Sequence, residues 1–138
     1  MTITLPEIYA ACALACGAVF LVTSTFSGSF MTGSKAYIVP AIFSSGFLSF
    51  SIITIVNEGL APVWYNHTLN YWGSQICIDL VVGFCVSWYL ILPRARDAGI
   101  LIYPWLVIVL FTGNIGITAM LAFVLFREAQ DGRGYRQL

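Results

Sequence analysis

The stretch of sequence that decides the fold is residues 75–127, which read QICIDLVVGFCVSWYLILPRARDAGILIYPWLVIVLFTGNIGITAMLAFVLFR. It holds two long apolar runs, separated by the segment PRARDAG at residues 93–99. Asp79 is the only charged residue inside either run. Because about 20 apolar residues in a helix cross a bilayer core about 30 Å thick, each run predicts one membrane-spanning helix.

The composition of the whole chain excludes two classes of protein. Of the 138 residues, 59% are hydrophobic and 9% are charged, and the mean hydropathy is +0.89. Soluble domains carry about 25% charged residues, so this chain has too few charges to cover a water-soluble globule. Six basic and six acidic residues leave no net positive charge, which argues against a nucleic-acid partner. We therefore expect the lipid bilayer to be the solvent of this chain.

Two further uncharged runs, residues 8–34 and 36–57, precede the deciding stretch. The membrane interior offers no water to backbone N–H and C=O groups, so spanning segments should be helices. We predict an all-α, polytopic integral membrane protein, with one four-transmembrane-helix bundle over residues 1–126. The predicted spans are residues 7–26, 36–56, 71–92 and 103–126, followed by a polar C-terminal tail at 127–138.

Prolines and aromatic residues predict how the last two spans are joined. Pro93 should end the third helix because proline lacks the amide proton that a helix interior needs. Pro104 lies early in the fourth helix, where that missing donor costs little. Folding the chain at residues 93–99 brings Trp88 level with Trp105, and aromatic rings at one depth are typical of the headgroup boundary.

The same folding places Asp79 level with Asn114, deep in the membrane. A carboxyl at the bilayer centre costs about 2.5–3.5 kcal/mol on insertion scales, so we expect Asp79 to face inward and to have a partner. Asn114 is the first candidate partner, and Gln75, one helical turn earlier, is the second. Two interpretations stay open: a hydrogen bond that joins two helices, or a ligand, proton or substrate site.

Small residues and a charged loop complete the candidate site. Gly83, Gly113 and Gly116 are spaced along the last two spans, where small residues allow helix backbones to approach one another. We predict that they pack helices or bind a ligand together with Gln75, Asp79 and Asn114. The loop between the spans carries Arg94, Arg96 and Asp97.

No metal site or familiar catalytic motif is predicted. The four cysteines lie inside predicted helices without a CxxC motif, and His67 is the only histidine, so no Cys/His metal cage can be drawn. The chain has no G-x-S-x-G, H-E-x-x-H or phosphate-binding glycine loop.

The orientation in the membrane is nearly balanced. Four spans place Lys35, Arg94 and Arg96 on one side and Arg127, Arg133 and Arg136 on the other. Because Lys35 is the only cation that flanks the first span, the positive-inside rule favours a cytoplasmic position for the first and third loops.

The deciding stretch resembles a bacterial family of small helical membrane proteins of unknown function. In that family an Asp-Leu-x-Val helix is followed by an Arg/Asp-rich loop ending in Gly, then by a Pro-Trp helix start and a Gly-x-x-Gly helix. The matching residues are Asp79-Leu80, Val82-Gly83, Arg94, Arg96, Asp97, Gly99, Pro104-Trp105, Gly113 and Gly116. The hairpin is also similar to plant and cyanobacterial membrane proteins tied to neoxanthin formation from violaxanthin, which implies a carotenoid connection.

Three functions compete at this point. The first is a small accessory subunit that holds a hydrophobic ligand, such as a carotenoid, quinone or other non-covalent isoprenoid pigment, against its many aromatic rings (15% of residues). The second is a membrane enzyme that acts on an isoprenoid or lipid with Asp79 as its acid or base. The third is an oligomeric proton-coupled transporter subunit. We expect the first, together with other membrane subunits or self-association.

Overall fold

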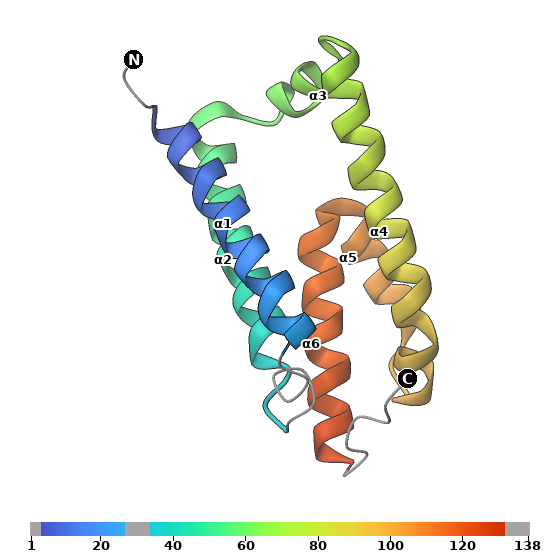
Figure 1. Ribbon diagram of the computed structural model, residues 1–138. Coiled ribbons are helices and arrows are strands. Elements are labelled where there is room, and N and C mark those ends of the chain that lie inside the picture. The colour runs from blue at the N-terminus through green and yellow to red at the C-terminus, as the bar shows by residue number, and fades with distance from the viewer. Residues whose placement is uncertain (1–3, 27–33, 132–138) are drawn as a thin grey trace.

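The computed structural model describes residues 4–26 and 34–131, and the described residues form helices and short turns. Figure 1 shows the arrangement of the helices. Their bounds are α1 Leu5–Phe26, α2 Ile38–Glu58, α3 Ala61–Thr68, α4 Tyr71–Asp97, α5 Ile102–Thr112 and α6 Asn114–Gln130. The predicted all-α class is confirmed. Three helices, α1, α2 and α4, are long and apolar enough to cross a membrane, which is consistent with an integral membrane protein.

The helix α4 is longer than the sequence predicts. It contains Pro93 and ends only at Asp97, so the prediction that proline ends it is wrong. The turn beyond the proline is held from outside the helix, because Ala95 is fully buried and Ile91 nearly so. Tertiary packing therefore outweighs the one backbone hydrogen bond that the proline removes.

A glycine ends α4 in place of the proline. Gly99 has φ +67°, a conformation that glycine adopts without steric penalty. The Gly99 N–H donates to the Arg96 carbonyl and the Ile100 N–H donates to the Ala95 carbonyl, both at 2.9 Å. These two bonds form a Schellman motif, and Ile100 and Ala95 share one buried cluster as that motif favours.

The predicted fourth span is two helices, not one. At Gly113 (φ 56°, ψ −124°) the chain leaves the helical conformation, and α6 runs back beside α5. The rings of Trp105 and Phe123, one from each helix, have centroids 5.9 Å apart. A Cβ added to Gly116 would lie 3.0 Å from the Val109 Cα, so the two backbones are in close contact. The single helix predicted over residues 103–126 is therefore wrong, because these two glycines allow a tight hairpin.

The helix α6 packs along α2 in the opposite direction. The hydroxyl of buried Ser44, a third of the way along α2, donates to the Ile115 carbonyl at the start of α6 at 3.0 Å. Tyr37, at the start of α2, meets Phe126 near the end of α6 with ring centroids 5.3 Å apart. The pairing of early with late residues establishes the antiparallel arrangement seen in Figure 1.

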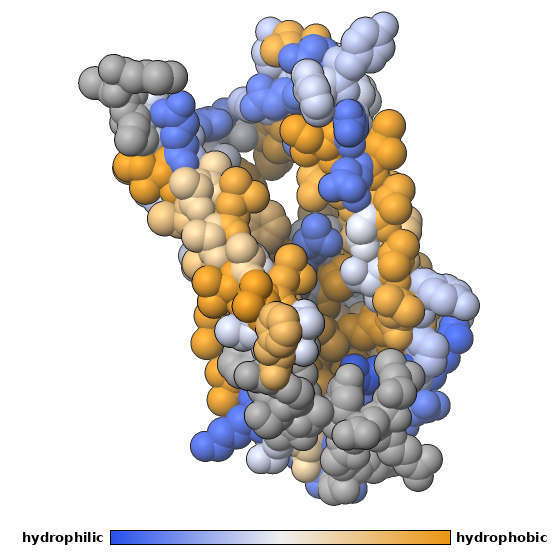
Figure 2. Space-filling view, viewed as in Figure 1, coloured by the Kyte–Doolittle hydropathy of each residue, from blue (hydrophilic) through white to orange (hydrophobic). Residues whose placement is uncertain are grey.

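The helix α1 lies against α2 on the outside of the bundle. Two edge-on ring pairs join them, Tyr9 with Phe50 at 5.3 Å and Phe20 with Phe43 at 5.4 Å. None of the described α1 residues is buried. Most of the α1 surface is therefore exposed, and Figure 2 shows that this surface is largely apolar.

The main buried cluster lies where α4 ends and the α5–α6 hairpin begins. Met120 and Val124 of α6 are fully buried within it. Trp88 and Trp105 both pack against this cluster, as expected from a chain that folds back after α4. The fold-back is confirmed, although a hairpin follows it rather than a single span.

The hairpin changes the distribution of charge between the two ends of the bundle. In Figure 1, the start of α2, the end of α4 and the end of α6 lie together, and we call this the arginine end. Its described Lys and Arg residues are Lys35, Arg94, Arg96 and Arg127. The opposite end, with the start of α1 and with α3, we call the α3 end. The expectation that Arg127 lies opposite Lys35 is wrong, because α6 returns to the end from which α5 starts.

Candidate ligand-binding site

A cavity of about 440 Å³ lies between α1, α2, α4 and α6. Small-molecule sites usually occupy about 300–1,000 Å³ and are lined mainly by apolar groups with a few polar ones. Most of the side chains around this cavity are apolar, and its polar side chains are Ser87, Arg94 and Thr118. The volume and the mostly apolar lining therefore fall within the range found for small-molecule sites.

The cavity exists partly because Gly17 has no side chain. A Cβ added at Gly17 would meet nothing within 4 Å, so space remains open between α1 and the other helices. One turn along, Phe20 lines the cavity and touches Phe43 of α2, which lines it as well. The aromatic pair closes one wall and the glycine leaves the volume beside it.

Two hydroxyl groups in the cavity wall use their protons within their own helices. The Ser87 hydroxyl donates to the Gly83 carbonyl at 2.8 Å. The Thr118 hydroxyl donates to the Asn114 carbonyl at 2.8 Å and lies 3.0 Å from the Ile115 carbonyl. A hydroxyl oxygen that donates its proton keeps lone pairs, so both groups are suited to accept a hydrogen bond from a ligand.

The charged part of the cavity wall is an oriented arginine. The Arg94 Nε donates to Glu128 Oε1 at 3.0 Å, and Arg94 Nη2 donates to Glu128 Oε2 at 2.6 Å. The two side chains are 32% and 20% exposed. Paired bonds of this kind hold a guanidinium in one plane, so the cavity has a fixed cation at the arginine end.

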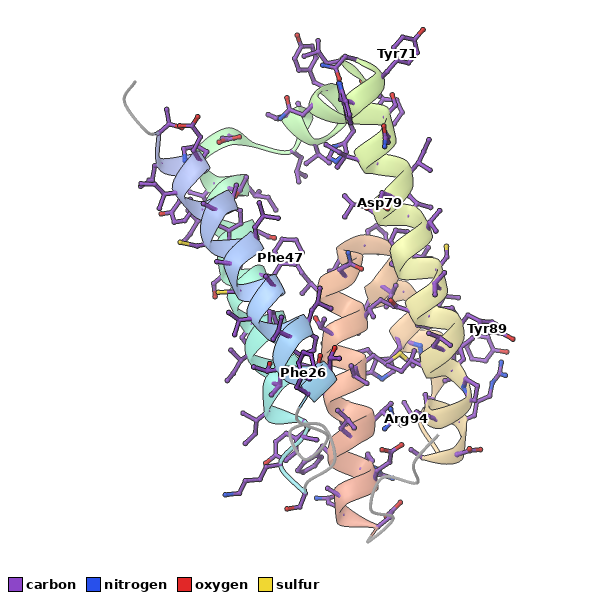
Figure 3. All side chains as sticks on the ribbon, in the orientation of Figure 1. Phe26, Phe47, Tyr71, Asp79, Tyr89 and Arg94 are labelled. Carbon is purple, nitrogen blue, oxygen red and sulfur yellow. The ribbon has the colours of Figure 1, made fainter. Side chains whose placement is uncertain are left out.

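Asp79, the predicted centre of the site, does not line this cavity. It is exposed and lies about 160° around α4 from buried Ala95, at 100° per residue. Figure 3 shows it high on α4, near the level of the α5–α6 turn. The expectation that Asp79 faces the core is wrong, because α4 packs through the Trp88 and Ala95 side.

The predicted partners of Asp79 are not bonded to it. Within residues 4–26 and 34–131, no hydrogen bond joins Asp79 to Asn114 or to Gln75. Asn114 is half-buried at the first position of α6, and Gln75 is exposed. The carboxyl and the amide reach a similar depth but not contact, since the break at Gly113 places Asn114 in a hairpin.

The predicted glycines have separate places in the fold. Gly113 forms the α5–α6 turn, and Gly116 allows α5 to approach α6. Gly83 is on α4, where an added Cβ would meet nothing within 4 Å. None of the three lines the cavity.

Of the predicted loop motif, only Arg94 lines the cavity. Arg96 and Asp97 are exposed in the last turn of α4. Three residues of the site were not predicted from the sequence: Ser87, Thr118 and Glu128, the last of which falls in the predicted polar tail. Glu128 could have been identified as an acidic residue that follows a long uncharged run and can pair with the arginine-rich loop.

The described residues offer no cluster for a metal ion. Within residues 4–26 and 34–131, no group of three or more His, Cys, Asp or Glu side chains comes together. His67 lies in α3, where its ring Nδ1 is 2.6 Å from the Val63 carbonyl oxygen of the same helix.

No protein-family model, curated protein or solved structure matches this chain. The resemblance of residues 75–127 to a bacterial membrane-protein family therefore stays a prediction.

Proposed function

We propose that this chain is a small integral membrane protein that holds a hydrophobic ligand, as an accessory subunit of a membrane assembly. The observation that carries the proposal is the cavity of about 440 Å³ between four helices, with an arginine fixed in its wall. A carotenoid, a quinone or another isoprenoid pigment is the class of ligand that an apolar site of this size suits.

The polar groups of the cavity narrow the ligand chemistry. Arg94 is a donor only, so it suits a carbonyl or carboxyl oxygen. Ser87 and Thr118 are suited as acceptors, because their protons are used within their helices, and they suit a ligand hydroxyl. Ser87 and Arg94 are about 10 Å apart along the axis of α4, at 1.5 Å per residue. The proposed ligand is a long apolar molecule that carries two oxygen groups about 10 Å apart.

The proposed placement in the membrane has three crossing helices, α1, α2 and α4, and a hairpin that enters and leaves at the arginine end. The α5 arm has 11 residues and is about 16 Å long, roughly half of a 30 Å bilayer core. Irregular backbone at such depth is tolerated where protein covers it, and Ser44 of α2 donates to the backbone beside the turn.

The charge distribution supports a cytoplasmic arginine end. Four described cations lie there, whereas among residues 4–26 and 34–131 the α3 end carries Glu7 and Glu58 without a Lys or Arg. Cytoplasmic loops are the ones enriched in Lys and Arg. The first and third loops would then face the cytoplasm, and so would the end of α6.

A pair of glycine variants tests the ligand-holding function. Gly17→Leu fills the open space inside the cavity. Gly46→Leu adds the same side chain outside it, in a separate groove along α2 that Gly46 lines with Ser45 and Ser49. Purified protein stripped of lipid is titrated with a quinone or a hydroxylated carotenoid, with tryptophan fluorescence as the signal. Saturable quenching in the wild type and in Gly46→Leu, but not in Gly17→Leu, is expected. Equal quenching in all three proteins would refute the function.

The position of Asp79 favours ligand holding over the enzymatic hypothesis. The proposed acid or base is exposed and lies about 12 Å along α4 from Ser87, the nearest α4 residue of the cavity wall. A ligand bound in the cavity would therefore not touch the carboxyl that the enzymatic hypothesis requires.

A further inference from the structure

Polar and small residues line one exposed face of the first half of α4. Gln75, Asp79 and Gly83 are spaced four residues apart, and all three are exposed. Four residues advance about 40° around a helix, so the three share one face, which we call the Asp79 face. Val86, about 20° from Asp79, extends it. This face lies opposite partly buried Trp88 and buried Ala95, and further along α4 the same direction leads to Leu90, which lines the cavity.

The chain provides no cover for the Asp79 face. Within residues 4–26 and 34–131, neither the Gln75 side chain nor the Asp79 side chain makes a hydrogen bond or an ion pair. Figure 2 shows that beyond the hairpin, towards the α3 end, α4 stands apart from α1 and α2. Ionisable side chains inside membranes almost always face protein or a water-filled cavity rather than lipid. Of these two surroundings, a protein surface is the one that the polar and small residues of the Asp79 face suit.

We infer that a second copy of this chain covers the Asp79 face, with the two α4 helices parallel across a two-fold axis. The two copies share one orientation in the membrane, so their α4 helices run in the same direction. The Gln75 amide of each copy then donates to the Asp79 carboxyl of the other. Under this symmetry each residue lies level with its own copy, and Gln75 is one helical turn, about 6 Å, from Asp79. The two hydrogen bonds therefore run diagonally across the interface, one in each direction.

The glycine on the same face supports a close helix pair. A Cβ at Gly83 would meet nothing within 4 Å inside the chain, so its absence is not explained by packing within one copy. Small residues at membrane interfaces let two backbones approach closely. The pairing does not depend on the cavity or on its ligand.

Cysteine cross-linking locates the interface directly. In a full-length background with Cys12, Cys16, Cys77 and Cys85 replaced by Ala, Val86→Cys is compared with Val81→Cys. The two valines are similarly exposed, at 52% and 44%, but Val81 lies about 160° around α4 from Asp79. In liposomes, a disulfide dimer through position 86 should exceed one through position 81 by about tenfold, since the bond requires the two Cβ atoms to lie within about 4.5 Å. Equal yields, or none at position 86, would overturn the inference.

Association measurements test the hydrogen bonds. Asp79→Leu and Gln75→Leu should each weaken self-association about tenfold in a fluorescence energy-transfer dilution series, the order expected for two interhelical hydrogen bonds lost per dimer. Asp79→Asn keeps an acceptor oxygen and should associate more strongly than Asp79→Leu. Ile78→Ala, another exposed position of α4, is the control and should associate like the wild type.

Folding and dimer formation can be separated in these experiments. Asp79 has no bonded partner within the described chain, so Asp79→Leu should keep the helical circular dichroism of the wild type. Wild-type association by a properly folded Asp79→Leu, or a wild type that stays monomeric in liposomes, would contradict the two-fold pair. The latter result would point to a different membrane protein as the cover of this face.

Discussion

Arg94 near the end of α4 and Glu128 near the end of α6 are joined by two hydrogen bonds, at 3.0 and 2.6 Å. The two residues are 34 positions apart in the sequence, and their pairing joins α4 to α6 and fixes the arginine in the cavity wall. It therefore links the stability of the hairpin with the chemistry of the proposed ligand site.

The contribution of this pair can be measured by a double-mutant cycle with Arg94→Met and Glu128→Gln. Hydrogen bonds to charged groups are worth about 1.5–3 kcal/mol, and both side chains are partly shielded. We expect a coupling free energy of about 1–2 kcal/mol for unfolding in detergent micelles. Additive single-variant effects would show that the pair is not coupled.

The α5–α6 turn predicts opposite effects for alanine at two glycines. Gly113→Ala places a side chain at φ 56°, a conformation that costs about 1–3 kcal/mol for other residues. Gly46→Ala lies within α2 with open space around it, and replacing a helical glycine there should stabilise by about 0.5–1 kcal/mol. Thermal unfolding in one detergent compares the two variants. A Gly113→Ala protein as stable as the wild type would contradict the turn.

The Ser44 hydroxyl tests the contact between α2 and α6. Ser44 is buried and donates to Ile115 on the other helix, whereas exposed Ser49 donates to Ser45 within its own helix. Ser44→Ala should lower the free energy of unfolding by about 1 kcal/mol, because the Ile115 carbonyl loses a partner. Ser49→Ala should change it by less than about 0.5 kcal/mol. Equal effects at the two serines would count against this packing.

Labelling from one side of the membrane distinguishes the hairpin from four spans. Single cysteines are placed at Glu58, Arg96 and Gln130 in the cysteine-free background, and vesicles of known orientation are treated with a membrane-impermeant maleimide. We expect positions 96 and 130 to react from one side and position 58 from the other, because α6 returns to the arginine end. Reaction of positions 58 and 130 from the same side would restore the four-span arrangement.

The sequence predicted the long helices well because their signal is local. Long apolar runs define α1, α2 and α4, and backbone hydrogen bonding in an apolar solvent leaves few alternatives to helix. Pro93 misled the prediction of one helix end, because the packing of Ala95 against α6 comes from residues far along the chain. Contacts between residues far apart in the sequence cannot be predicted from the local residue types alone.

The hairpin and the site were beyond what hydropathy can resolve. A straight helix and a tight hairpin have the same apolar composition over residues 102–126, and only the geometry at Gly113 separates them. The sequence predicts an inward Asp79 because a carboxyl exposed to lipid is costly. The protein surface that shields it can belong to another chain of the assembly, so this cost does not fix the orientation within one chain. The partner of Arg94 was missed because Glu128 becomes its neighbour only after the chain turns back.

The central claim, that the cavity holds a hydrophobic ligand, is tested most directly by native mass spectrometry of the full-length protein purified in mild detergent. The wild type should carry a lipophilic molecule as an added mass that Gly46→Leu retains and Gly17→Leu loses. An unliganded mass for all three proteins, or the same added mass on Gly17→Leu as on the wild type, would contradict the claim.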